Sequence, residues 1–242
     1  KIFTYNPAAT DAQGVVFKAP VDLTSLAADE ISQTQVTDLR SGNPAGGRAY
    51  LTGIIDYIKG DKSNEVRKAG GYSFRNRLDE NEQLFTLGAL VHSTPEYMGK
   101  PSELYPNDIA GASNPLYSTF VAANDEITER IPVVFVGAND GMLHAFNAGT
   151  TSAGGNELFA YIPSFLSDRS NGGNGLANLA DLNYQYKAYV DGPVSVRDVF
   201  VKKNGGVTAA WRSYLVGATR TGGNGLYILD VSNPDAMDVV DV

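Results

Sequence analysis

The stretch VVFVGANDGMLHAF, residues 133–146, decides the fold class of this chain. Two apolar runs, at 133–138 and 142–146, flank the turn sequence Asn139-Asp140-Gly141. An Asp-Gly pair supplies the positive φ angle that a tight hairpin turn needs, so the stretch predicts two antiparallel strands. The apolar run ELFAYI at 157–162 predicts a further strand just downstream.

A similar arrangement returns later in the chain. SYLVGA at 213–218 and LYILD at 226–230, joined by a glycine turn at 222–225, resemble the two halves of the first hairpin. The stretch 189–201 predicts a strand that alternates around Asp191-Gly192-Pro193, as the apolar stretch 87–98 predicts a strand around Ser93-Thr94-Pro95. Such repeats of about 40–45 residues before insertions are typical of β-propeller blades, and a β-sandwich with two similar hairpins is the alternative. Two blades cannot close a ring, so we expect the remaining blades to come from elsewhere.

The first part of the chain has a mixed pattern. Residues 2–5 alternate and predict a strand, and Thr24 is a candidate N-cap for a short helix that runs to Ile31. A second helix is predicted from Ala49 to Ile58, where apolar residues recur at three- and four-residue spacing, with Gly60 just beyond its end. We therefore expect a lead-in segment with short helices at 1–85. The first propeller blades follow at 86–242, with an inserted loop at about 101–130.

Composition supports this organisation and excludes several functions. The 242 residues include 26 Gly and 11 Pro, which favours many short strands over a few long helices. The net charge of −8 argues against a nucleic-acid-binding surface, and no apolar run is long enough for a transmembrane segment. Cysteine is absent, which excludes disulfides and thiolate chemistry. The chain starts at Lys1 without a signal peptide, and we interpret it as part of a longer protein.

Several blocks of sequence, taken in order, resemble one known family. They are IDYIKGDKSNE (55–65), FRNR (74–77), LGALVHSTP (87–95), VFVGANDGMLHAF (134–146), ELFAYIP (157–163), YVDG (189–192) and GNGLYILDVSNP (223–234). Together they resemble the C-terminal propeller region of PilC/PilY-type proteins, which are type IV pilus tip adhesins and assembly factors. The resemblance covers roughly residues 50–235, and the joint presence and order of the blocks make it specific.

The resemblance implies an all-β, quinoprotein-like partial propeller of about two blades plus edge strands, preceded by a partly helical segment. It implies a non-catalytic, secreted module at the pilus tip or cell surface, associated with the outer membrane. Such a module would act in pilus assembly and adhesion, with minor pilins and pilus tip components as partners and host-cell receptors or surfaces as further ones. Family members bind calcium in a later, Asp-rich propeller loop. No such run occurs in this chain, so we assign no metal or cofactor to it.

The tripeptide Lys59-Gly60-Asp61 is the one candidate recognition site. Some family members carry Arg-Gly-Asp, an integrin-type motif, and Lys keeps the charge of Arg while losing its bidentate fork. The alternative interpretation is a helix end, with Gly60 after the last turn and Lys59 favourable to the helix dipole.

Other polar groups predict no catalysis. His92 and His144 are the only histidines, and their spacing does not indicate a metal site. His144 lies in an alternating strand with Met142 and Phe146 on its face, so we expect it to be a packed or rim residue. No G-x-S-x-G occurs, and the glycine runs at 172–175 and 222–225 lack the Lys-Ser/Thr of a phosphate loop, which predicts ordinary turns. The patch at 124–126 is expected to be solvated.

Aromatic residues leave two further interpretations open. Trp211 with Tyr184, Tyr186 and Tyr189 could form a ligand-binding surface, although core packing and blade edges are the alternative. The run NELFAY at 156–161 resembles the blade-edge repeat of quinoproteins, which makes a PQQ-dependent oxidoreductase propeller the alternative function. A generic scaffold propeller of outer-membrane assembly machinery is a third possibility.

Overall fold

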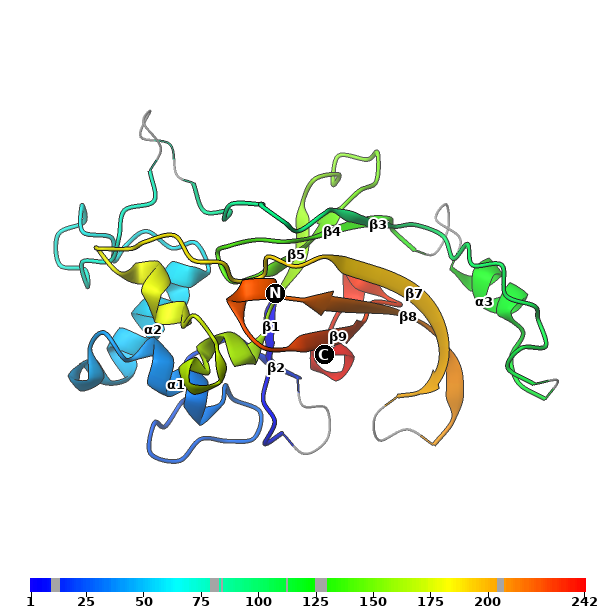
Figure 1. Cartoon of the computed structure of the whole chain (residues 1–242), viewed down its shortest axis with the longest axis horizontal. Coiled ribbons are helices and arrows are strands. Elements are labelled where there is room, and N and C mark those ends of the chain that lie inside the picture. Colours follow the sequence, from blue (N-terminus) through cyan, green and yellow to red (C-terminus); the bar gives the residue numbers. More distant parts are fainter. Residues whose placement is uncertain (10–13, 79–82, 84, 112, 125–129, 204–206) are drawn as a thin grey trace.

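The predicted hairpin lies in the larger of two β-sheets (Figure 1). Strands β4 (Val133–Gly137) and β5 (Leu143–Asn147) pair antiparallel, as predicted, and Gly141 in the turn has a φ of +99°. The structure is a computed structural model, and it describes residues 1–9, 14–78, 83, 85–111, 113–124, 130–203 and 207–242.

Four more strands, two of them from the N-terminus of the chain, complete the six-stranded sheet. β3 (Glu96–Met98) pairs with β4, and β6 (Glu157–Ile162) pairs with β5. β1 (Ile2–Tyr5) then adds parallel to β6, and β2 (Gly14–Val16) adds antiparallel to β1. The order β2-β1-β6-β5-β4-β3 therefore places the N-terminal strand of the lead-in segment in the same sheet as the first hairpin.

The second sheet contains the repeat of the first hairpin. β7 (Val194–Lys202), β8 (Ala209–Ala218) and β9 (Leu226–Asp230) pair antiparallel in the order β7-β8-β9, and the long β7 and β8 bend together (Figure 1). β3 and β4 contact β7, so the two sheets meet along these strands. At this junction Gly137 lies so close to Val190 that a Cβ there would be 2.3 Å from the Val190 carbonyl oxygen. The glycine of the repeated Val-Gly-Ala motif thus permits close approach of the two sheets.

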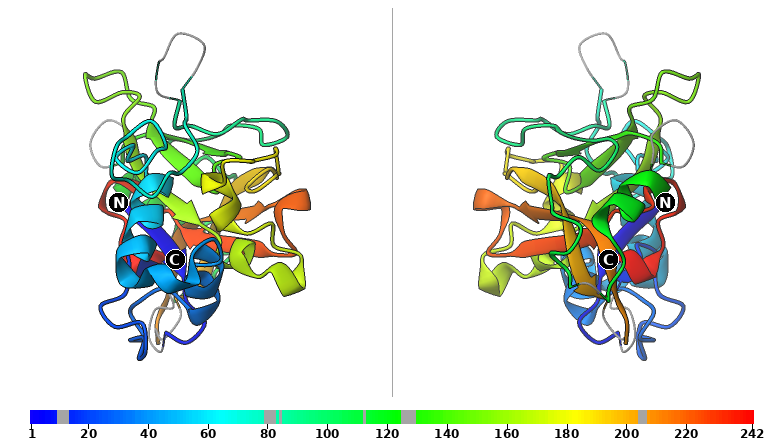
Figure 2. Two further views of the ribbon diagram at one scale, coloured as in Figure 1. Left: turned by 90° about the vertical axis from the view of Figure 1, so that its left-hand side faces the viewer. Right: turned by 90° about the vertical axis from the view of Figure 1, so that its right-hand side faces the viewer.

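Helical segments gather mostly beside the sheets, at one end of the molecule (Figures 1 and 2). The α-helices are α1 (Gln33–Leu39), α2 (Gly47–Ile58) and α3 (Tyr117–Ala123). Short 3-10 turns occur at η1 (Pro44–Gly46), η2 (Ser164–Ser167), η3 (Arg169–Asn171), η4 (Leu176–Ala180), η5 (Arg220–Gly222), η6 (Pro234–Ala236) and η7 (Val239–Asp241). α1 contacts α2, η2 and η4, whereas α3 lies apart at the opposite end (Figure 1).

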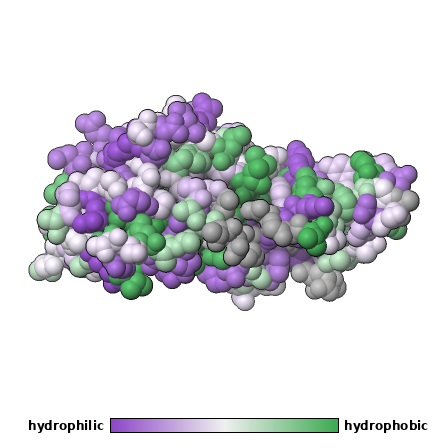
Figure 3. All heavy atoms as spheres, turned by 90° about the horizontal axis from the view of Figure 1, so that it is seen from below, coloured by the Kyte–Doolittle hydropathy of each residue, from purple (hydrophilic) through white to green (hydrophobic). Residues whose placement is uncertain are grey.

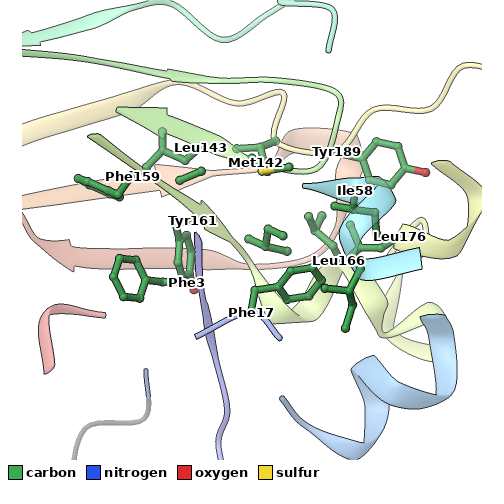
Figure 4. Close-up of a cluster of buried hydrophobic side chains, with 14 of the residues drawn as sticks. Phe3, Phe17, Ile58, Met142, Leu143, Phe159, Tyr161, Leu166, Leu176 and Tyr189 are labelled. Atoms are coloured by element: carbon green, nitrogen blue, oxygen red, sulfur yellow. The ribbon is translucent and has the colours of Figure 1, made fainter. Parts of the chain in front are cut away.

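One hydrophobic cluster joins the sheets to the lead-in segment. Phe3, Phe17 and Ile55 of the lead-in segment are almost fully buried in the same cluster as Leu143 and Leu215 of the two sheets. Figure 4 shows Phe17 beside Leu166 and Leu176, and Phe3 beside Tyr161. Because apolar burial is the main stabilising contribution to folding, the lead-in helices and the first sheet stabilise each other.

The helix predicted to begin after Thr24 is absent, and a helix begins instead after Ser32, eight residues further along the chain. Residues 24–31 are not helical, because the Glu30 carboxylate accepts hydrogen bonds from the backbone N–H groups of Val21 and Ala27 and closes a loop. α1 begins only after Ser32, whose side chain forms a capping box with Gln35. The second predicted helix is confirmed, since α2 covers it and begins two residues earlier.

Two predicted strand regions are shorter than expected, and the predicted loop contains a helix. Within 87–98 only β3 is a strand, because the backbone around Gly88 and Ala89 bonds to the β4–β5 turn instead. β7 starts only after Pro193, because Asp191 is bound to the first sheet's turn. The region 101–130 contains α3, which Tyr117 anchors through a 2.6 Å hydrogen bond to the buried Asp198.

Candidate functional site

The predicted recognition motif and both histidines lie around one junction. Here the end of α2 and the stretch 85–92 meet the β4–β5 turn. Two neighbouring cavities open there and share Ile58, Thr86, Leu87 and Asp140 in their walls. We call them the histidine cavity, about 220 Å³, lined by His144 and Lys59, and the arginine cavity, about 300 Å³, lined by Arg75 and Arg77.

In the histidine cavity, His144 is held between two carboxylates. Its Nδ1 lies 2.5 Å from Glu157 Oε1, and its Nε2 lies 3.1 Å from Asp140 Oδ2. Asp140 is fixed in turn by the backbone N–H groups of Gly88, at 2.7 Å, and Met142, at 3.1 Å. His144 therefore connects β5, β6 and the hairpin turn to the stretch that follows the lead-in segment.

These contacts favour the charged form of the imidazole. Burial alone would lower the pKa of His144, but the hydrogen bonds to Asp140 and Glu157 outweigh burial and raise the pKa to about 9. Both ring nitrogens are engaged by carboxylates, so an imidazolium fits this position better than a neutral metal ligand or general base. The expectation of a packed histidine is confirmed, with the addition that it is ion-paired.

His92 belongs to a second, separate network. Its Nδ1 lies 2.6 Å from Asp191 Oδ2, and Asp191 also accepts a 3.0 Å hydrogen bond from the side chain of Asn139. Burial favours a raised pKa for Asp191, but these hydrogen bonds lower it below its usual value. The His92 ring is about half exposed. Since Asp191 precedes β7 and Asn139 follows β4, the network ties the two sheets together.

The end of α2 is fixed by buried ionic contacts. Glu65 is fully buried between Arg77, at 3.0 Å, and Arg67, at 2.7 Å. Arg77 also donates to the carbonyl oxygens of Tyr57 and Asp61, and its guanidinium lies 3.7 Å from the centre of the Tyr57 ring. Arg77 therefore fixes the turn that carries Lys59-Gly60-Asp61.

Lys59-Gly60-Asp61 forms the predicted helix end. Lys59 is the C-cap of α2, and Gly60, with a φ of +107°, donates its N–H to the Tyr57 carbonyl. Asp61 is exposed, and its carboxylate accepts hydrogen bonds from the side chain and the backbone of Ser63, which lower its pKa. The helix-end interpretation is confirmed by this geometry. A recognition role for the three residues stays a prediction.

The predicted aromatic grouping does not form around Trp211. Its ring packs instead against Tyr105, Tyr117 and Phe200, and its Nε1 donates to the Pro115 carbonyl, so it anchors the α3 region. Tyr184 and Tyr186 line the arginine cavity, where they form part of an aromatic surface. Tyr189 is buried in the core. Of the patch at 124–126, Asp125 and Glu126 lie outside the described residues.

Sequence reasoning missed several partners at this junction. Asp140 was interpreted only as a turn residue, Glu157 only as the start of a strand, and Arg75 only as part of a family block. The signal for Asp140 was its spacing of four residues from His144 across a hairpin turn, which brings the two side chains together. Nothing in the sequence pairs Arg75 with Tyr184, because 109 positions separate them and only tertiary packing joins them.

The described part of the chain shows no arrangement suited to metal binding or membrane crossing. No group of three or more His, Asp or Glu side chains among the described residues converges on a point where a metal could bind. None of the described helices combines the length and apolar character needed to cross a bilayer. On the face seen in Figure 3, apolar side chains form small patches between polar ones.

Comparison with known proteins identifies the family. Residues 87–241 match the model of the PilY1 beta-propeller domain. A type IV pilus biogenesis factor PilY1 homolog of Xylella fastidiosa is 38% identical over 182 residues, and PilY1 of Pseudomonas aeruginosa strain PAK is 36% identical over 185 residues. Each match covers 74% of this chain but 13% of the relative, so the chain spans only a small part of those proteins.

A solved structure is also similar. The crystal structure of the Pseudomonas aeruginosa PilY1 C-terminal domain is 38% identical, covering 57% of this chain and 23% of that chain, with a TM-score of 0.37. The names of these relatives describe pilus biogenesis and do not favour the oxidoreductase alternative. With its two β-sheets and a family match over most of its length, this chain belongs to the family of PilY1 β-propeller domains.

Proposed function

We propose that this chain is a non-catalytic module of a type IV pilus biogenesis factor, and that it acts by binding other proteins at the pilus tip or cell surface. The family match over residues 87–241 carries this proposal. The polar geometry supports it, because the ionisable groups at the junction are mostly engaged with each other in structural contacts. Such contacts fix the shape of a surface, which is what a binding module needs.

The two sheets fit two blades of a larger, quinoprotein-like propeller. In this proposal the antiparallel strands β3-β4-β5-β6 of the first sheet would form one four-stranded blade, and β7-β8-β9 would be three strands of the next. A closed ring needs further blades, and we expect these, together with the family's calcium loop, in other parts of the protein. The strands β1 and β2 from the lead-in segment would extend the first blade at its β6 edge.

Minor pilins and other pilus tip components are the partners we expect. The test is co-purification of affinity-tagged full-length protein from cells that produce the pilus, with immunodetection of minor pilins. A matched protein that lacks residues 87–241 serves as the control. Recovery of minor pilins with the complete protein and not with the shortened one supports the proposal. Equal recovery with both would show that this module does not make the contact.

Adhesion through Lys59-Gly60-Asp61 is a second binding role within the same proposal. Asp61 is exposed on a fixed turn, and Lys59 lies 3.6 Å from Asp56 in a half-exposed ion pair that a partner could replace. Attachment of cells to an integrin-coated surface should fall with Asp61→Asn, and the neighbouring exposed Lys62→Ala provides the control. If both variants attach as well as the parent strain does, the motif serves only as a helix end.

A further inference from the structure

Arg75 is held rigidly in the wall of the arginine cavity. Its backbone N–H donates to the Ala180 carbonyl at 3.0 Å, and its Nε donates to the Leu179 carbonyl at 3.1 Å. Its guanidinium carbon lies 4.0 Å from the centre of the Tyr184 ring, in a cation–π contact. These contacts engage the Nε edge and the flat face of the guanidinium and fix its position. The residue is half-buried.

Unlike the neighbouring Arg77, Arg75 is not ion-paired with an acid in the part of the chain that the structure describes. Arg77 in the same cavity is bound to Glu65, and elsewhere Arg169 is bound to Asp38 and Arg212 to Asp230. Within the described ranges, Arg75 forms no ion pair with any carboxylate. In a chain with 27 acidic and 19 basic residues, a fixed arginine with no acidic partner among the described residues can offer Nη N–H groups to a ligand, beside its contact with the Tyr57 hydroxyl.

The rest of the cavity wall favours an anion with a flat or apolar body. The Tyr186 hydroxyl accepts a 2.8 Å hydrogen bond from Asn139, which leaves its own proton to be donated. Among the described lining residues Asp140 is the acid, and Gly88, Met142 and His144 already engage its oxygens. The rings of Tyr184 and Tyr57 supply apolar surface beside the arginine.

We propose that the arginine cavity binds a carboxylate group, which the Nη groups of Arg75 hold while the Tyr186 hydroxyl donates a further hydrogen bond. A volume of about 300 Å³ fits one side chain or chain terminus of a partner protein. The carboxylate comes from an acidic side chain or from a C-terminus, and these two sources share the same chemistry. The cavity would bind it whether or not the module acts in pilus assembly.

The test uses the whole chain, labelled with ¹⁵N at arginine, and follows the Nε–Hε signal of Arg75 by NMR during peptide titrations. The probes are acetyl-Ala-Glu-Ala-amide for a side-chain carboxylate and acetyl-Ala-Ala-Phe with a free C-terminus. Their neutral counterparts are acetyl-Ala-Gln-Ala-amide and acetyl-Ala-Ala-Phe-amide. We expect saturable shifts with at least one acidic probe and binding about tenfold weaker with its neutral counterpart, because a charge-assisted hydrogen bond is lost. The acidic probe that binds more tightly identifies the source.

Variants place the binding at this cavity. Arg75→Gln should weaken binding of the acidic probe about tenfold, and Arg75→Lys should weaken it less, since the charge remains but the fork is lost. Arg197→Gln, which changes an exposed arginine on β7, should bind as the parent chain does. Equal binding of acidic and neutral probes by the parent chain would overturn the proposal. This comparison needs no variant and decides the question even if Arg75→Gln fails to fold.

Discussion

Replacing His144 by Gln should remove a pH-dependent part of the stability of this chain. In the folded chain the pKa of His144 is raised from 6.5 to about 9, because its hydrogen bonds to Asp140 and Glu157 outweigh burial. A group whose pKa is raised on folding stabilises the fold fully below its unfolded pKa and loses this effect as the pH rises through its folded pKa. The window therefore runs from about pH 6.5 to about pH 9.

The magnitude follows from the size of the shift. A difference of about 2.5 between the folded and unfolded pKa, at about 1.4 kcal/mol for each unit of pKa, corresponds to about 3–3.5 kcal/mol of unfolding free energy. The His144 side chain is only 8% exposed, so solvent screening reduces this value little. Gln keeps a polar side chain of similar reach but carries no charge at any pH.

The assay is urea-induced unfolding of the parent chain and of His144→Gln at about pH 6 and about pH 10, followed by tryptophan fluorescence of Trp211. The stability difference between the two proteins should be about 3 kcal/mol larger at the lower pH. Glu157→Gln, which removes one carboxylate and leaves Asp140, should show a smaller change between the same two conditions. A parent–variant difference that is equal at both pH values would refute the argument, because His144 would then not be charged in the fold.

Four further substitutions test the contacts that join the sheets and the lead-in segment. Gly137→Ala should lower the urea midpoint and cost about 1–3 kcal/mol of unfolding free energy, because the new Cβ would lie 2.3 Å from the Val190 carbonyl oxygen. An unchanged midpoint would mean that the two sheets do not approach this closely. Glu65→Gln should cost about 3–5 kcal/mol, because it leaves the largely buried Arg77 side chain and the partly buried Arg67 without their acid. A loss below about 1 kcal/mol in calorimetry would argue against this network around the buried Glu65. Asp191→Ala should cost about 1–3 kcal/mol of unfolding free energy in the same urea assay, because the Asp191 side chain is buried. His92→Ala should cost less than about 1 kcal/mol, because the His92 ring is half exposed. A larger loss with His92→Ala than with Asp191→Ala would contradict the role of Asp191 in joining the two sheets.

The strand pattern was readable from the sequence because each hairpin is a local feature. Alternating apolar residues and an Asp-Gly turn specify β4 and β5 within fifteen residues, and the repeat of Val-Gly-Ala predicted β8. The helix α2 was equally readable, since its apolar residues recur with helical spacing and Gly60 follows its end. These elements need no distant partner in order to be recognised.

The errors arose where distant residues decide the local structure. Thr24 looks like a helix N-cap, but the buried Glu30 uses its carboxylate to close a loop there instead. Residues 189–193 look like a strand, but Asp191 is bound to Asn139, 52 positions away. The parallel pairing of β1 with β6 also joins residues about 158 positions apart, and no local pattern indicates it. For the same reason the arginine cavity was not predicted.

The most direct test of the central claim is the amount of assembled pili in the organism that makes this protein. Pilin sheared from the cell surface would be quantified by immunoblot in a strain whose protein lacks residues 87–241, in a deletion strain and in the parent strain. If this region works as a binding module of a pilus biogenesis factor, the shortened protein should leave surface pilin near the level of the deletion strain. Parental amounts of surface pilin with the shortened protein would contradict the account.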